Sequence, residues 1–329
     1  MLDTRDGGRT LGMGELVDVE GAFVQAPFGK ALAALAHERG NVVGLTADMG
    51  RYSDIHPFRD AHPSKFFNVG MAEQNLVAVS AGLAKTGKVV YATTYAAFVT
   101  RRAYDFIAIA CAHSKANVKI FAGTPGLING YGGTHQATED LAMMRAVPDL
   151  VVIDPCDATE LSMVVRAVAD HAGPVYVRNL RGNVPVVFDA GRHRFSIGKA
   201  LCVREGSDVG VVSTGFMTAR ALTAAQQAAD LGVSVAVLHV PTIKPFDKEA
   251  VLQFCRQFPR LVTAENHQIS GGLATLVTET LFDAGVVKPL QKVGLADRFF
   301  DCGSQPYLER KFGLDTAFLL KACMNSKEN

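Results

Sequence analysis

Short apolar runs alternate with longer stretches of mixed apolar and polar residues along the first half of the chain. Each run has the length and composition of a buried strand, and the stretches between the runs have helical spacing, as Leu32, Leu35 and Ala36 show. Strands that alternate this regularly with helices predict a doubly wound α/β domain with a parallel sheet. The strands are expected at 41–45, 66–69, 89–93, 117–122, 150–154 and 174–178, and the helices at 26–39, 72–84, 95–113, from 141 onward and at 158–169.

The pattern is lost between 183 and 206, where charged residues accumulate, and a second α/β unit follows. Its strands are expected at 209–213, 234–240 and 260–264, with helices at 214–232 and 271–285. The chain is therefore predicted to consist of a leader (1–20), a larger domain (21–190), a linker (191–206) and a smaller C-terminal α/β domain (207–329).

Composition narrows the class of protein. The chain has 329 residues, of which 48% are hydrophobic and 20% charged, and its net charge of +1 favours neither nucleic acid nor an anionic membrane. No window approaches the roughly 18 apolar residues of a membrane span, and the polar N-terminus lacks a signal sequence. The six cysteines form no CxxC pair. Reduced thiols in a cytoplasmic globular protein are expected.

The stretch FFNVGMAEQNLVAVSAGLA, residues 66–84, is the most informative in the chain. A buried strand is expected at 66–69, and a helix that is apolar nearly all round, and therefore buried nearly all round, is expected after Gly70. Glu73 lies in the first turn of that helix. A solvated Glu is ordinary there, but a buried one needs a hydrogen-bond partner or a proton. The residues alone leave both interpretations open.

Other candidate residues lie at the expected ends of strands, the edge where parallel sheets bind ligands. Thr46 and Asp48 follow the strand at 41–45 and serve either a ligand or a turn. Tyr95 and Phe98 share one helix face, as core aromatics or as the wall of a site.

Two further segments carry residues suited to substrate binding. His135 follows Gly132 and Gly133 in a loop, where an imidazole is free to exchange protons near neutral pH. Arg178 and Arg181 lie at a strand end, and their guanidinium groups suit phosphate or sulfonate oxygens, although a solvated rim is the alternative.

GMAEQN with its Ala/Gly-rich helix resembles the pyrimidine-binding domain of thiamine-diphosphate enzymes of the transketolase group. GTHQATEDLAMMRAVPD (133–149) is similar to transketolases and deoxyxylulose-phosphate synthases, and TAENHQISGG (263–272) to the final domain of the family. LADRFFDCGSQPYLERKFGLD (295–315) resembles the tail of the synthases. The resemblance implies a pyrimidine-binding domain followed by a transketolase C-terminal domain.

The resemblance also assigns roles to residues. It implies that Glu73 contacts N1′ of the aminopyrimidine, that Tyr95, Phe98 and Arg101 line the cofactor, and that His135 acts on the substrate beside the reacting carbon. The resemblance also implies that Arg181 binds the acidic end of the sugar. Arg178 and Thr46 are further substrate-binding candidates because of their positions at strand ends, whereas His267 is a weak candidate for which a structural role is favoured. Two positions depart from transketolases, because Tyr131 and Gly123 stand where an Asp and a His usually contact the sugar.

The family's diphosphate-binding motif, GDG with a later Asn, is absent from the sequence. The resemblance therefore implies that Mg²⁺ and the diphosphate of thiamine diphosphate bind to a separate N-terminal transketolase subunit, with no metal ligand in this chain, in an α2β2 assembly. The expected reaction transfers a two-carbon ketol unit from a ketose, a phosphate or similar acidic sugar, to an aldose. The alternatives are the β subunit of a 2-oxoacid dehydrogenase and a non-catalytic partner subunit of the same fold.

Overall fold

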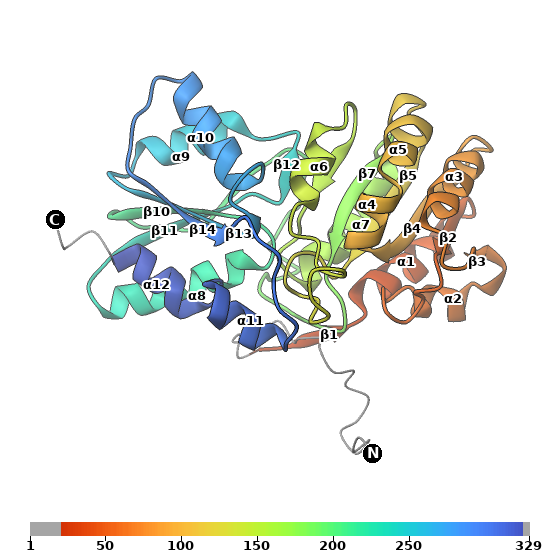
Figure 1. Ribbon diagram of the computed structural model, residues 1–329, viewed down its shortest axis with the longest axis horizontal. Helices are drawn as coiled ribbons and strands as arrows, with labels where there is room; N and C mark the ends of the chain where they lie inside the picture. The colour runs from red at the N-terminus through yellow and green to blue at the C-terminus, as the bar shows by residue number, and fades with distance from the viewer. Residues whose placement is uncertain (1–20, 325–329) are drawn as a thin grey trace, which may run out of the picture.

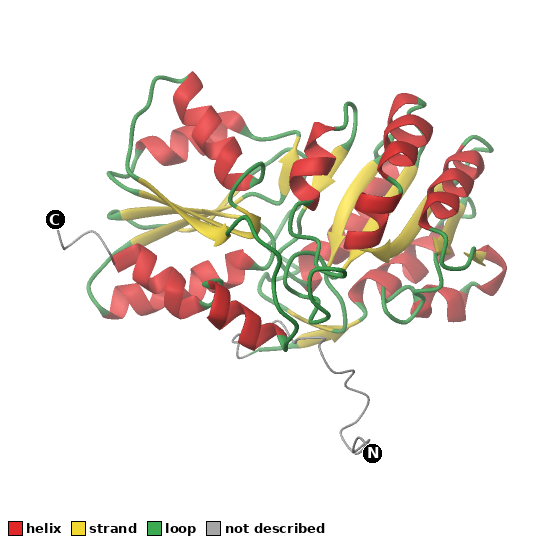
Figure 2. Ribbon diagram, in the orientation of Figure 1, coloured by secondary structure: helices red, strands yellow, loops and turns green. Residues whose placement is uncertain are grey.

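The computed structural model describes residues 21–324, so the predicted leader lies outside the described residues. A seven-stranded sheet organises the first domain, in the order β12-β6-β7-β5-β4-β2-β3. Its neighbouring strands are parallel except for β12. Helices α1 and α7 cover one face, and α3, α4 and α6 cover the other (Figures 1 and 2). The prediction of a doubly wound parallel sheet is confirmed.

The elements of this domain follow the apolar pattern because strands covered on both faces read as continuous apolar runs. Every residue of β2, β4, β5, β6 and β7 is buried. The elements are β1 (Phe23–Gln25), α1 (Pro27–Glu38), β2 (Val42–Thr46), α2 (His56–Ala61), β3 (Phe66–Asn68), α3 (Glu73–Ala84), β4 (Val89–Tyr95), α4 (Ala96–Arg102), α5 (Tyr104–Phe106), a π-helical segment (Ile107–His113), β5 (Val118–Gly123), α6 (Asp140–Ala146), β6 (Val151–Ile153), α7 (Ala158–Asp170), β7 (Val175–Asn179) and β8 (Asn183–Pro185).

The second domain contains a five-stranded sheet in the order β14-β13-β10-β11-β9. Helices α9 and α10 lie on one side of it and α8 and α12 on the other (Figure 1). Its elements are β9 (Leu201–Arg204), β10 (Val209–Ser213), α8 (Met217–Asp230), β11 (Val235–His239), β12 (Thr242–Lys244), α9 (Lys248–Arg256), β13 (Leu261–Gln268), α10 (Leu273–Asp283), β14 (Leu290–Leu295), α11 (Gln305–Phe312) and α12 (Thr316–Met324).

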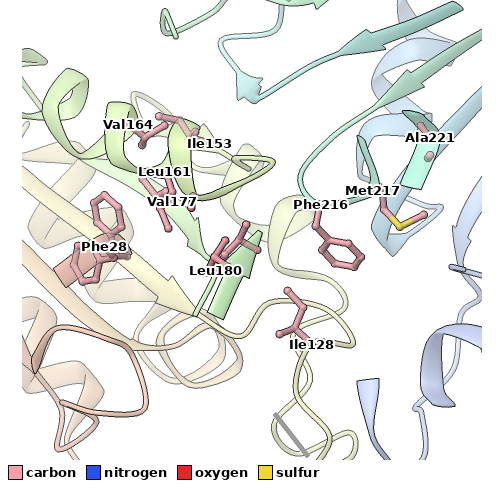
Figure 3. Close-up of a cluster of buried hydrophobic side chains, with 14 of the residues drawn as sticks. Phe28, Ile128, Ile153, Leu161, Val164, Val177, Leu180, Phe216, Met217 and Ala221 are labelled. Atoms are coloured by element: carbon pink, nitrogen blue, oxygen red, sulfur yellow. The ribbon is translucent and has the colours of Figure 1, made fainter. Parts of the chain in front are cut away.

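The two domains share structure across their boundary. β12 leaves the second domain and pairs antiparallel with β6 of the first sheet. The apolar core is continuous as well, because Ile128 and Leu180 belong to the same cluster as Phe216 and Met217 (Figure 3). Burial of so many aliphatic side chains on both sides of the boundary stabilises the two domains as one packed body.

Four details differ from the sequence-based expectations. β3 is a half-exposed edge strand, with Phe67 43% exposed, and α3 exposes Gln74, Asn75 and Val79 along one face. Apolar composition marks such a face as suited to burial but does not show which chain covers it. The expected helix over 95–113 is divided into α4, α5 and the π-helical segment, and β9 lies within the expected linker. No helix among residues 21–324 is long and apolar enough to cross a membrane.

Candidate functional site

The candidate site lies where the central strands of the first sheet end. Thr46, Tyr95, Gly123 and Asn179 are the last residues of β2, β4, β5 and β7, and these strands are neighbours in the sheet. Their carboxyl ends therefore lie at one edge of the sheet, and the loops that follow carry the candidate side chains. This is the edge at which open parallel sheets bind ligands.

Glu73 is the first residue of α3 and is only 6% exposed. Its two carboxylate oxygens lie 3.1 and 3.2 Å from Nη1 of Arg102, whose side chain is 55% exposed. The buried carboxylate thus has the partner that its burial requires. The sequence did not identify this partner: Arg102 is the residue after Arg101, which was predicted to line the cofactor.

Aromatic rings surround His135 on several sides. The His135 ring centroid lies 5.0 Å from that of Phe98, 5.5 Å from that of Tyr131 and 6.3 Å from that of Tyr95. Tyr95 and Phe98 also contact each other, with 5.6 Å between their centroids. The predicted cofactor-lining aromatics and the predicted catalytic histidine therefore lie together in one cluster.

The pKa of His135 is lowered, first by partial burial and then by the positive charge of Arg102. Its Nδ1 lies 2.8 Å from the hydroxyl of Thr134. A lowered pKa favours the neutral imidazole at neutral pH. In that form one ring nitrogen can accept a proton while the other donates one.

Arg101 holds the loop that carries His135. Its Nε and Nη2 donate to the carboxylate of Glu139 at 2.5 and 3.0 Å, and Nη1 and Nη2 donate to the carbonyls of Gly133 and Gln136 at 3.0 and 2.8 Å. These bonds bracket His135 along the chain. In this structure the guanidinium is bound to the loop, and its contact with the cofactor stays a prediction.

Replacing Arg101 by Ala is expected to loosen the loop. Because the pair with Glu139 is partly exposed, the expected loss of unfolding free energy is modest, about 1 kcal/mol. Faster amide hydrogen exchange over residues 132–139 should accompany it. The matched control is Arg166→Ala, which removes an exposed pair with Glu38 far from the loop. Unchanged exchange over 132–139 in the Arg101 variant would contradict the bracing role.

Arg181 follows β7 and has buried nitrogens without a partner. Among residues 21–324, no hydrogen-bond partner lies within reach of its buried Nε and Nη1, and its guanidinium lies 5.9 Å from the centroid of the Tyr52 ring. Its charge and a hydrogen bond also act on the phenol of Tyr95, whose pKa burial raises to about 12. A guanidinium with free donors at this edge is suited to a tetrahedral anion.

Asp54 is a buried carboxyl group in the same region, and it interacts electrostatically with Arg181. Burial raises its pKa to about 6, against the opposing effects of the Gly182 N–H and the Arg181 charge. The backbone N–H of Gly182 donates to its carboxylate at 2.5 Å. Asp54 has a left-handed backbone, with a φ of 60°, and no motif in the sequence identified it.

Arg178 does not lie in the site. It is 1% exposed, within β7, and donates to Asp140 at 2.9 Å, to Asp154 at 3.4 Å and to the carbonyl of Asn266 at 3.1 Å. All of these partners are buried. The prediction of a substrate-binding Arg178 is therefore corrected: the side chain joins the two domains.

Three weaker candidates have structural roles. Thr46 accepts a hydrogen bond from the Met49 N–H at 3.2 Å, and Asp48 accepts one at 2.9 Å from the side-chain amide of Asn68, the last residue of β3. Substrate binding by Thr46 stays a prediction. His267 is fully buried, with a pKa lowered to about 4 by burial, and its Nε2 accepts from the Ala142 N–H. The structural interpretation holds for His267. No cluster of His, Cys, Asp or Glu suited to a metal ion occurs among residues 21–324.

Sequence comparisons identify both domains of the chain. Residues 23–187 match the model of the transketolase pyrimidine binding domain, and residues 198–318 match that of the transketolase C-terminal domain. The chain belongs to the transketolase family.

Relatives of similar length support this assignment. The chain is 49% identical over 294 residues to a transketolase family protein of Sinorhizobium fredii, covering 88% of this chain and 85% of that one. It is 37% identical over 307 residues to a 6-deoxy-6-sulfo-D-fructose transketolase subunit of Clostridium sp., covering 93% and 95%. Among solved structures, a split-gene transketolase described as an inactive β4 tetramer matches with a TM-score of 0.85 and 38% identity, covering 93% and 98%.

Proposed function

We propose that this chain is the pyrimidine-binding subunit of a thiamine-diphosphate-dependent transketolase that moves a two-carbon ketol unit from an acidic ketose to an aldose. The observation that carries the proposal is the buried Glu73 carboxylate, which Arg102 links to the ring of Phe98, itself packed against His135. The relatives named as transketolase subunits support the same reaction class.

The side chains present fit the aminopyrimidine end of the cofactor. A carboxylate that starts a helix and is nearly buried can hold a proton on a ring nitrogen, and the half-buried Phe98 offers a flat apolar surface for a ring. When bound, thiamine diphosphate supplies the nucleophilic carbon and the electron sink of the reaction. Glu73 would hold the proton, and Tyr95 with Phe98 would keep water away.

The remaining residues would act on the sugar. His135, neutral at its lowered pKa, would accept and return protons at the sugar hydroxyls. Arg181 would hold the acidic end through the donors that lack a partner in this structure. Tyr131, next to His135 where transketolases usually carry an Asp, is expected to alter which sugars are accepted.

A second subunit would complete the enzyme. The sequence lacks the GDG motif, so the diphosphate and Mg²⁺ would bind to a separate N-terminal transketolase subunit, in a cytoplasmic α2β2 assembly. The split-gene and subunit names of the relatives support this arrangement. The exposed side of α3 and the exposed Met71, beside Glu73, give this surface the character of an interface. The family match and these names favour transketolase over a 2-oxoacid dehydrogenase subunit or a non-catalytic partner.

The test is ketol transfer by the reconstituted pair. The chain is mixed with a GDG-containing partner, thiamine diphosphate and Mg²⁺, and supplied with an aldose and either 6-deoxy-6-sulfofructose or a ketose phosphate. Mass spectrometry should show a product two carbons longer than the aldose. Release of CO₂ from a 2-oxoacid without ketol transfer would indicate the dehydrogenase, and inactivity with every donor would favour the non-catalytic partner.

Arg181→Ala is expected to raise KM for ketoses that end in phosphate or sulfonate. A charge-assisted hydrogen bond contributes about 1.5–3 kcal/mol, so KM should rise by about ten- to a hundredfold. KM for a ketose without the anionic group should change little, because Arg181 has nothing to bind there. Equal effects on charged and uncharged ketoses would contradict the role. Arg166→Ala is the control.

A further inference from the structure

Arg102 holds two of the groups that the proposed cofactor site would use. Its Nη1 donates to both carboxylate oxygens of Glu73, and its guanidinium carbon lies 4.2 Å from the centroid of the Phe98 ring. A guanidinium is planar, carries N–H donors and stacks on aromatic faces. An aminopyrimidine ring is also planar, and its protonated ring nitrogen donates to a carboxylate, so the two groups suit the same carboxylate and the same aromatic ring.

We propose that Arg102 is a further residue of the cofactor site. In the chain without its partner, the Arg102 guanidinium contacts Glu73 and Phe98, and it must leave both before an aminopyrimidine ring can bind there. The inference rests on the proposed function, because it concerns the same site. It adds one feature that the family assignment does not include, namely that the Arg102 side chain competes with the aminopyrimidine ring for Glu73 and Phe98.

The position of Arg102 allows its side chain to leave. It is the last residue of α4, next to Ala103, where the helix is interrupted, and its side chain is 55% exposed. Departure from Glu73 would therefore place the guanidinium in water without disturbing the core. The adjacent Arg101 differs in this respect, because two backbone carbonyls and Glu139 hold it in place. The two arginines thus have separate roles, one fixed and one exchangeable.

The contact has a consequence for affinity. A bond made only in the cofactor-free state stabilises that state, and its free energy is subtracted from the free energy of cofactor binding. Removal of Arg102 should therefore strengthen cofactor binding. If Arg102 instead held the cofactor directly, its removal would weaken binding, so the sign of the change distinguishes the two roles.

The experiment is calorimetric titration of thiamine diphosphate with Mg²⁺ into the full chain mixed with its diphosphate-binding partner. Arg102→Ala should lower Kd about fivefold, equivalent to about 1 kcal/mol. Arg102→Lys keeps the charge but loses the planar fork, and should give a smaller decrease. Arg166→Ala, which removes an exposed arginine elsewhere, should leave Kd unchanged. Thermal unfolding of each variant verifies that the chain is folded.

An unchanged or higher Kd in folded Arg102→Ala and Arg102→Lys would overturn the inference while leaving the proposed function intact. Absence of binding by the unaltered mixture would overturn the proposed function itself. A lower Kd with Arg102→Ala, beside an unchanged Kd with Arg166→Ala, would support the competition.

Discussion

Glu73→Gln is expected to lower turnover of the assembled enzyme by about a thousandfold, within the range for loss of general acid–base catalysis. Gln has the same shape and can still accept a hydrogen bond, but it cannot exchange a proton with a ring nitrogen. The measurement is kcat with saturating ketose, aldose and cofactor. Folding should be nearly unaffected, because the carboxylate's partner Arg102 is largely exposed and such pairs contribute less than about 1 kcal/mol.

Glu38→Gln provides the matched control. It makes the same chemical change in an exposed pair with Arg166, away from the site, and should keep normal turnover. Full activity in the Glu73 variant would remove this residue from the mechanism.

Arg178→Met is expected to cost about 3–5 kcal/mol of unfolding free energy. The variant fills most of the space of the side chain but leaves Asp140 buried without the cation that compensates its charge. Tyr176 still donates to Asp140 at 2.7 Å, which offsets only part of the loss. Denaturant unfolding measures the change. Arg166→Met, in an exposed pair, should cost less than about 1 kcal/mol.

A double variant separates charge from packing at the same position. Arg178→Met with Asp140→Asn removes the uncompensated charge, and it should be more stable than Arg178→Met alone. If the double variant loses as much unfolding free energy as Arg178→Met and Asp140→Asn lose separately when added together, the buried ion pair is not the cause of the loss in Arg178→Met.

Most of the parallel strands could be predicted because helices cover both of their faces, which makes them continuous apolar runs. β9, β12 and β14 could not, because β9 and β14 are half-exposed edge strands and β12 pairs with a strand of the other domain. The burial of α3 was overestimated for a related reason. Its exposed side has a composition that suits an interface, and a single sequence does not show which chain covers it.

Among the site residues, the sequence could not establish the direction in which individual side chains point. Residues three and four positions after Phe98 lie on the same helix face, so the sequence did not distinguish Arg101 from Arg102. The end of α4 at Arg102 separates them: Arg101 turns to the loop and Arg102 to Glu73. Similarly, β7 continues past Arg178 to Asn179, which buries Arg178 and leaves Arg181 at the edge.

The most direct measurement is a crystal structure of this chain assembled with its diphosphate-binding partner, thiamine diphosphate and Mg²⁺. A Glu73 carboxylate oxygen within hydrogen-bond distance of the pyrimidine ring, with the diphosphate held by the partner, is the expected result. A Glu73 side chain directed into solvent, or a cofactor held entirely by one chain, would contradict the account.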